Sequence, residues 1–136
     1  MVSATIPIYG SLQVKAQLGE TSTQLVQNLR WARENSIGRY NNSAYGVYLN
    51  LTSVPNSYTI YQGGSYATRV VSSDRVTNLE NVIAIRNGNL NLTSNDIDIN
   101  FSAGLGKPNN VGNFYLVHSI NGTSTISINS LGKIEE

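Results

Sequence analysis

A stretch of long side chains without proline, from Ile8 to Asn35, is the feature that most constrains the fold of this chain. Within it, apolar and small residues return at steps of three and four, which places them on one face of an α-helix. The members of this stripe are Leu18, Ser22, Leu25, Leu29, Ala32 and Ser36. Gly38 can adopt the left-handed conformation that ends many helices. We therefore expect a single helix that stops near Ile37.

This helix is longer than a domain of this size needs. About 30 residues at 1.5 Å each give a rod of roughly 45 Å, which exceeds the width of such a domain. Residues 1–14 carry no charged side chain, and we expect the part before Lys15 to lie outside the globular core. We interpret it as an assembly surface; the alternative is an ordinary helix with a frayed apolar start. The residues assigned to this assembly surface are Ile6, Pro7, Ile8, Tyr9 and Leu12.

From residue 40 onward the pattern changes to short β-prone runs between turn residues. Asn-Gly between two apolar runs is the strongest short hairpin signal, so Phe114–Ser119 should pair with Ser124–Asn129 across Asn121-Gly122. The predicted strands are Tyr45–Leu51, Tyr58–Gln62, Ala67–Val71, Asn81–Arg86, Asp96–Phe101, Asn113–Ser119 and Thr125–Asn129. The chain is thus predicted to be one α+β domain over 1–136, with a helix in 1–39 and an antiparallel β-sheet region in 40–136 that pack together. The residues expected at the helix–sheet contact are Leu18, Leu25, Leu29 and Ala32.

Composition removes several classes of function. Charged residues make up 12% of the chain and the formal net charge is +1, so net charge alone gives no strong grip on nucleic acid or anionic lipid. The chain has no cysteine, which excludes disulfides, zinc–thiolate sites and cysteine nucleophiles. The basic residues of the β region are spread along the sequence, and we interpret them as dispersed solubilising charge. They are Arg69, Arg75, Arg86, Lys107 and Lys133.

The sequence does not favour an enzyme. His118 is the single histidine, and in a predicted strand it shares a face with Phe114 and Leu116, which indicates a half-buried structural role. A serine hydrolase would need this histidine, an orienting carboxylate and a nucleophile motif that the chain lacks. We expect no catalytic residues and no cofactor.

A run of alternating acids resembles the start of a calcium loop only superficially. In Asp96-Ile97-Asp98-Ile99-Asn100 the required glycine is replaced by Phe101, and the expected bidentate glutamate is Lys107. In a strand, the polar residues of this run share one face and the isoleucines share the other. We therefore expect a solvated face over a core face, and no metal site.

The order of these features resembles the type IV pilin-like proteins, and among them the minor pilins and pseudopilins of the GspH/FimT type. The opening "SATIPIYGSLQ" is similar to the point where such proteins leave their hydrophobic segment, with Pro7 in the place of the helix-loosening proline. The best match is "LVQNLRWARENSIGRYNNSAYGVYLN", a leucine-spaced helix followed by Gly38-Arg39 and a Tyr-Gly-Val-Tyr strand. Further on, "INFSAGLGKP" and "STISINSLGKIEE" resemble the family's Ile-x-Phe-x-x-x-Gly stretch and its closing strand and turn.

The resemblance implies a structural subunit of a bacterial type IV pilus or of a type II secretion pseudopilus. Its partners would be other pilin or pseudopilin subunits, and the membrane, reached through a hydrophobic N-terminal segment that is absent from this chain. It would be extracytoplasmic, anchored in the inner or cytoplasmic membrane before it enters the filament. Exposed loops such as Gly63–Tyr66 and Gly104–Val111 are candidate partner surfaces.

The alternative is an exported binding module that recognises DNA or a surface glycan through tyrosines and amides. The family's DNA-capturing branch carries a basic Gly-Arg-rich tail. Here the corresponding residues run from Gly132 to Glu136 and include two acids. We therefore do not expect nucleic acid as a partner.

Overall fold

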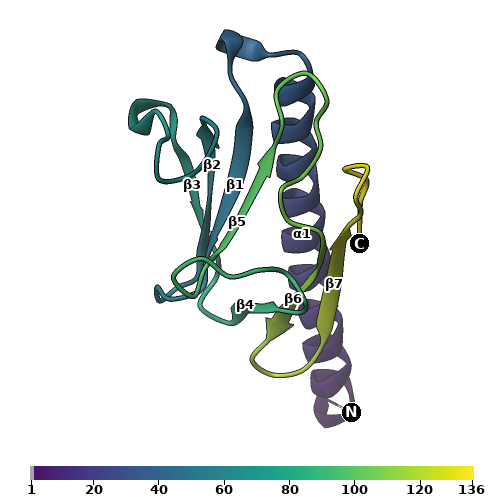
Figure 1. Ribbon diagram of the computed structural model, residues 1–136. Coiled ribbons are helices and arrows are strands. Elements are labelled where there is room, and N and C mark those ends of the chain that lie inside the picture. The colour runs from purple at the N-terminus through teal and green to yellow at the C-terminus, as the bar shows by residue number, and fades with distance from the viewer. Residues whose placement is uncertain (1) are drawn as a thin grey trace.

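The computed structural model describes residues 2–136, with the side chains of residues 12–136. A single long helix, α1 (Val2–Ile37), runs beside two antiparallel sheets, and its N-terminal part continues past their ends (Figure 1). The α+β class predicted from the sequence is therefore correct. The predicted stripe is buried beneath the sheets: Leu25, Leu29, Ala32, Ser22 and Ser36 are fully covered, and Leu18 nearly so.

Each sheet has four strands. The first has the order β3-β2-β1-β5 and the second the order β4-β6-β7-β8. The strand bounds are β1 (Tyr45–Asn50), β2 (Ser57–Gln62), β3 (Arg75–Asn78), β4 (Ile83–Asn87), β5 (Ile97–Phe101), β6 (Gly112–His118), β7 (Thr123–Ile128) and β8 (Ile134–Glu135). The hairpin predicted at Asn121-Gly122 is confirmed as β6–β7, with Phe114 opposite Ile126 and Leu116 opposite Ser124.

Alternation along the strands sorts apolar from polar residues. In β1, Val47 and Leu49 are fully buried, and in the neighbouring β5 so are Ile97 and Ile99. These side chains face α1, while the residues between them lie on the opposite face of the first sheet. In the second sheet Phe114, Leu116 and Ile126 complete the same core. Both sheets thus bury one face against a single helix.

One predicted strand is wrong, and two strands of the structure were not predicted. The segment predicted as a strand over Ala67–Val71 is irregular, and a short 3₁₀ turn (Val71–Ser73) follows it. The strand lies further on, at Arg75–Asn78, where most residues are exposed at the edge of the sheet. An exposed edge strand lacks the apolar alternation on which the prediction depends. The two-residue β8 was also missed, because it is too short to show any period.

The end of α1 is where the sequence placed it, but a different residue makes the turn. Gly38 keeps a helical hydrogen bond from its N–H to the carbonyl of Glu34, at 3.0 Å. The left-handed conformation is adopted by Arg39, with φ 50° and ψ 44°, and by the asparagines at 41 and 42. Asparagine tolerates this conformation better than most residues, so the chain reverses direction through three residues within 39–42 instead of through Gly38.

The core begins one residue earlier than predicted. Val14 is only 8% exposed, and it packs beside Leu18 under the β6–β7 turn, where a Cβ added at Gly122 would lie 3.3 Å from the Val14 Cγ1 atom. The expectation that everything before Lys15 lies outside the core is therefore wrong at this position. The exposed fraction of Leu12 is 57%.

We expect deletion of residues 1–13 to leave the domain folded and to change its free energy of unfolding by less than about 1 kcal/mol. By contrast, Val14→Ala in the full chain should cost about 1–2 kcal/mol, because it uncovers a buried apolar contact. Urea unfolding followed by circular dichroism measures both. If removal of residues 1–13 unfolds the domain, that segment belongs to the core and is not a free helix end.

Candidate functional site

The free part of α1 is the first candidate site. Of the five residues assigned to assembly, Ile6, Pro7, Ile8 and Tyr9 lie outside the residues whose side chains are described. Leu12 is described and exposed. In Figure 1 this part of the helix extends beyond both sheets, so its backbone has no sheet beside it. Such a helix end can contact a second molecule without disturbing the core.

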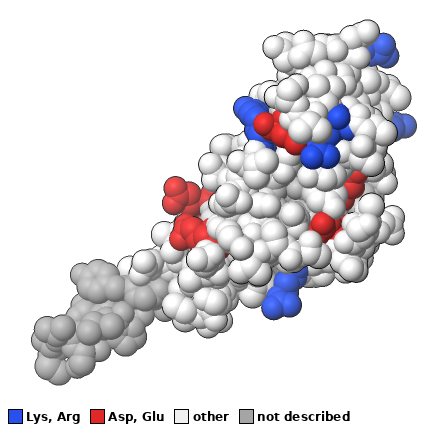
Figure 2. Space-filling model, turned by 90° about the vertical axis from the view of Figure 1, so that its left-hand side faces the viewer, with Lys and Arg blue, Asp and Glu red and all other residues white. Residues whose placement is uncertain are grey.

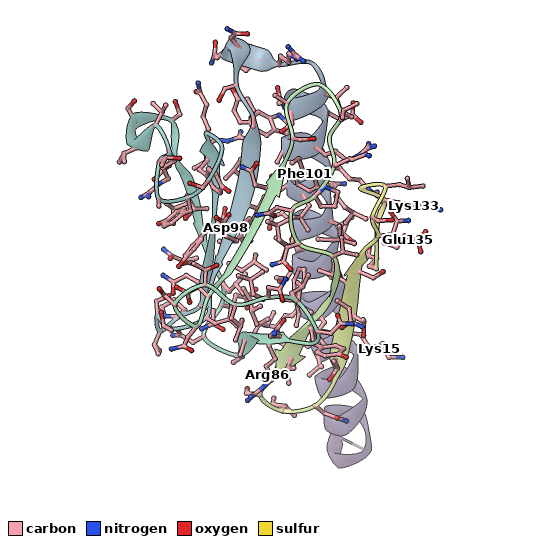
Figure 3. The ribbon with its side chains drawn as sticks, in the orientation of Figure 1. Lys15, Arg86, Asp98, Phe101, Lys133 and Glu135 are labelled. Atoms are coloured by element: carbon pink, nitrogen blue, oxygen red, sulfur yellow. The ribbon has the colours of Figure 1, made fainter. Side chains whose placement is uncertain are left out.

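The face of the first sheet that points away from α1 is a hydrogen-bonded layer, not the solvated face predicted for Asp96, Asp98 and Asn100. Asp98 lies on this side of β5 (Figure 3) and accepts a hydrogen bond from the hydroxyl of Tyr61. Asp96 accepts one from the hydroxyl of Tyr48 at 2.6 Å. Asp96 and Asn100 are only 6% and 7% exposed. The alternation was read correctly, but tyrosines from other strands cover the polar side.

A loop closes over this layer. The ring of Tyr66 stacks on Tyr48 with ring centroids 3.7 Å apart. The Arg69 guanidinium also lies over the ring of Tyr66. Arg69 is in turn held by Asp74 at 2.9 Å, and this hydrogen bond raises the pKa of Arg69. Burial, followed by the hydrogen bond to Asp96, raises the pKa of Tyr48 far above its ordinary value. The tyrosine therefore stays protonated and acts as a donor.

The two loops proposed as partner surfaces differ in how much they are tied down. Gly63–Tyr66 is tied to the hydrogen-bonded layer, because the Tyr66 N–H donates to Asp98 and the Gly63 carbonyl accepts from Asn100. In Gly104–Val111, Leu105 is 68% exposed, while Gly106 packs on the end of α1. Of the two, the tip at Leu105 is the more open to a partner.

His118 is buried, and its contacts fit a structural role. Its Nε2 atom lies 2.7 Å from the side-chain oxygen of Gln17, and its Nδ1 atom accepts the N–H of Ile120 at 3.2 Å. Gln17 also donates to Glu80. With Nδ1 as an acceptor, the proton must sit on Nε2, so the ring ties α1 to the β6–β7 turn. Neither ring nitrogen is left for a substrate.

An aromatic cavity at the C-terminal end of α1 was not predicted. Its volume is about 270 Å³. Tyr45 forms the buried base, and the indole of Trp31 meets it edge to face with ring centroids 5.7 Å apart. Tyr40 is 58% exposed, and its ring lies 6.3 Å from that of Tyr45. The cavity thus presents aromatic surface to solvent, which is typical of binding sites rather than of a core.

The polar groups of this cavity are amides, hydroxyls and one guanidinium. The guanidinium of Arg75 lies over the Trp31 ring, 4.1 Å from its centroid. Asn41 donates to the Tyr45 hydroxyl, and Ser73 donates to the side-chain oxygen of Gln62. Among the described residues that line the cavity, none is acidic.

Only part of this cavity could be seen in the sequence. Trp31 falls at the edge of the helical stripe, which predicts partial exposure. Tyr40 and Tyr45 flank the helix end, but nothing local brings Arg75 to them. The pairing of β3 with β2, in which Arg75 lies opposite Ile60, positions it, and β3 itself was not predicted.

The other basic residues are dispersed, in agreement with their interpretation. Seen from the side of β3, most of the surface is uncharged, and its blue and red atoms are partly intermixed (Figure 2). Lys133 pairs with Glu135 at 2.8 Å, and Arg86 lies apart from both, near the lower end of the sheets (Figure 3). A second cavity, of about 250 Å³, lies between α1 and β8 and is lined by Arg30, Arg33, Glu34, Gly132, Lys133 and Ile134.

The contacts of that second cavity are largely internal. Arg30 donates to the carbonyl of Ile134 at 2.8 Å, and Arg33 donates to that of Leu131. The Nε atom of Arg33 is buried without an acceptor among the described atoms. Both arginines thus fasten the C-terminal hairpin to the helix.

Among the described residues, no three histidine, aspartate or glutamate side chains gather as a metal ion would require. Nor does the described part of α1 reach the apolar length of a membrane-spanning helix.

Comparison of the chain with protein-family models, curated proteins and solved structures found no match.

Proposed function

We propose that the protein is a structural subunit of a bacterial filament of the type IV class, a minor pilin or pseudopilin of the GspH/FimT type. The observation that carries this proposal is the length of α1, which continues past both sheets (Figure 1). An uncharged run over residues 1–14 and an exposed Leu12 accompany it. The α+β arrangement is compatible with a pilin-like fold.

In this proposal the subunit acts by packing and carries out no reaction. Apolar helices from many copies and from related subunits form the filament core, because burying their side chains removes apolar surface from water. The sheets remain outside, held by the stripe that includes Leu25 and Leu29. Before assembly the subunit is extracytoplasmic and anchored in the inner or cytoplasmic membrane, and afterwards it belongs to a pilus or pseudopilus.

Charges placed on the free helix end test the proposal. With Ile6→Glu and Leu12→Glu introduced together in the native host, we expect no detectable incorporation into filaments, because an unpaired charge in an apolar bundle is very costly. Immunoblotting of sheared filaments against whole cells gives the readout.

Gln24→Glu is the matched control. Gln24 is exposed on the same helix but beside the sheets, so this variant should assemble normally. The purified double variant should also keep the stability of the unchanged domain. If the double variant assembles as well as the control, the helix end is not the packing element and the proposal is wrong.

A further inference from the structure

We propose that the aromatic cavity formed by Trp31, Tyr40, Tyr45 and Arg75 binds a sugar that carries a carboxylate, a hexuronate. This inference does not depend on the filament proposal, because the cavity lies at the C-terminal end of α1, away from the free helix end. It starts from three properties of the cavity: exposed aromatic surface, neutral hydrogen-bonding groups around it, and one cation without a counterion.

Exposed aromatic surface is the first property. Tyr40 is 58% and Trp31 36% exposed, although both stand against the buried ring of Tyr45. A pyranose has an apolar face made of C–H groups, and that face can lie on the ring of Tyr40 while Trp31 forms a wall. The rings are already in contact with Tyr45, so little conformational freedom is lost on binding.

The neutral polar groups are the second property. Asn41, Gln62 and Ser73 line the same cavity. An amide offers both donors and an acceptor, and a hydroxyl offers one donor and two lone pairs. Sugar hydroxyls need this mixture, because each can both donate and accept. Asn41, Gln62 and Ser73 keep donors and acceptors beyond the bonds they make within the cavity, and a purely apolar ligand would leave these without partners, at a cost in affinity.

The cation is the third property, and it selects an acidic sugar over a neutral one. Arg75 forms no ion pair with any described side chain, whereas Arg69 and Lys133 each have an acidic partner. A guanidinium pairs with a carboxylate through two parallel hydrogen bonds. Stacking on Trp31 holds that guanidinium at the cavity. The charge complementarity is therefore to one carboxylate.

The presence of a single cation at the cavity also disfavours single-stranded nucleic acid as the ligand. Stacking aromatics are shared by both kinds of site, but a strand of phosphates needs a basic groove that follows its backbone. Among the described residues that line this cavity, Arg75 is the one cation. We therefore infer a ligand with a single negative charge per ring.

The protein carries its own reporter for the test. Trp31 is the only tryptophan in the sequence, so its fluorescence reports this cavity alone. The purified chain of residues 1–136 is titrated with D-glucuronate, with tetragalacturonate, with D-glucose and with an oligothymidylate. We expect a saturable change in emission with a hexuronate and at least about tenfold weaker binding of glucose. Titration with D-galacturonate, the monomer of that tetramer, distinguishes a free sugar from a polymer as the source.

Two variants assign the response to residues. Arg75→Gln should remove the preference for uronate over glucose, and Tyr40→Ala should weaken both at least about tenfold. Arg86→Gln changes another exposed arginine, on β4 near the other end of the sheets (Figure 3), and should leave binding unchanged. The far-ultraviolet circular dichroism of each variant must match that of the parent.

Three outcomes overturn the inference. The first is no saturable change with either uronate. The second is a preference for uronate that persists in Arg75→Gln. The third is a stronger response to the oligothymidylate, which would make the cavity a nucleic-acid site. None of them bears on filament assembly, which is read out separately in the host.

Discussion

Leu29→Ala is expected to lower the free energy of unfolding by about 2–5 kcal/mol. Leu29 is fully buried at the centre of the stripe on α1, so truncation removes transfer free energy and leaves a cavity that the surrounding sheets can fill only partly. Leu25, which is also fully buried, should behave in the same way. Urea denaturation followed by circular dichroism provides the measurement.

Gln24→Ala is the control for these leucine variants. Gln24 lies next to Leu25 in sequence but on the exposed side of α1, where substitutions usually change stability by less than about 0.5 kcal/mol. An effect of Leu29→Ala as small as that of the control would mean that the stripe does not face the sheets.

Gly46→Ala is expected to destabilise the domain by about 3 kcal/mol, at the upper end of the range for an overpacked core. A Cβ at position 46 would overlap the hydroxyl of Tyr61 and would come within 2.7 Å of the carbonyl oxygen of Ile99. Tyr61 is fully buried and bonded to Asp98, so it can move away only by giving up that hydrogen bond.

The loop after β2 offers a glycine for comparison. At Gly64 an added Cβ meets nothing within 4 Å, so Gly64→Ala should change the free energy of unfolding by less than about 0.5 kcal/mol. Equal effects at the two positions would contradict the close packing of Tyr61 over β1. Thermal unfolding of both variants under one set of conditions decides the matter.

The helix and its buried stripe could be predicted because their signal is local. Leu18, Leu25 and Leu29 recur with the helical period, and burial follows from that period once something covers the stripe. The β6–β7 hairpin was found for the same reason, because Asn121-Gly122 fixes its turn. The division of the strands into two sheets has no local signal, since it depends on which distant strands pair.

Two of the candidate sites, the hydrogen-bonded layer on the first sheet and the aromatic cavity, depend on such distant pairings. Alternation placed Asp98 and Asn100 on one face correctly, but the register that brings Tyr61 over them joins β2, β1 and β5. The aromatic cavity likewise needs Arg75. This residue lies on β3, an exposed edge strand without the apolar alternation by which strands are predicted. The sequence alone therefore predicts candidate sites that lie within one continuous segment, such as the N-terminal part of α1, and misses sites that distant strands build together.

The arrangement of α1 has a mechanical consequence. No strand of one sheet pairs with a strand of the other in the described chain, and α1 contacts β1 and β5 on one side and β6, β7 and β8 on the other. A pull along the helix axis from its N-terminal end would therefore load both sheets in parallel. It would act in shear across many packed side chains, instead of opening one strand pair after another. Resistance to such a load depends on the unfolding rate, and the side chains that set it are those of the buried stripe.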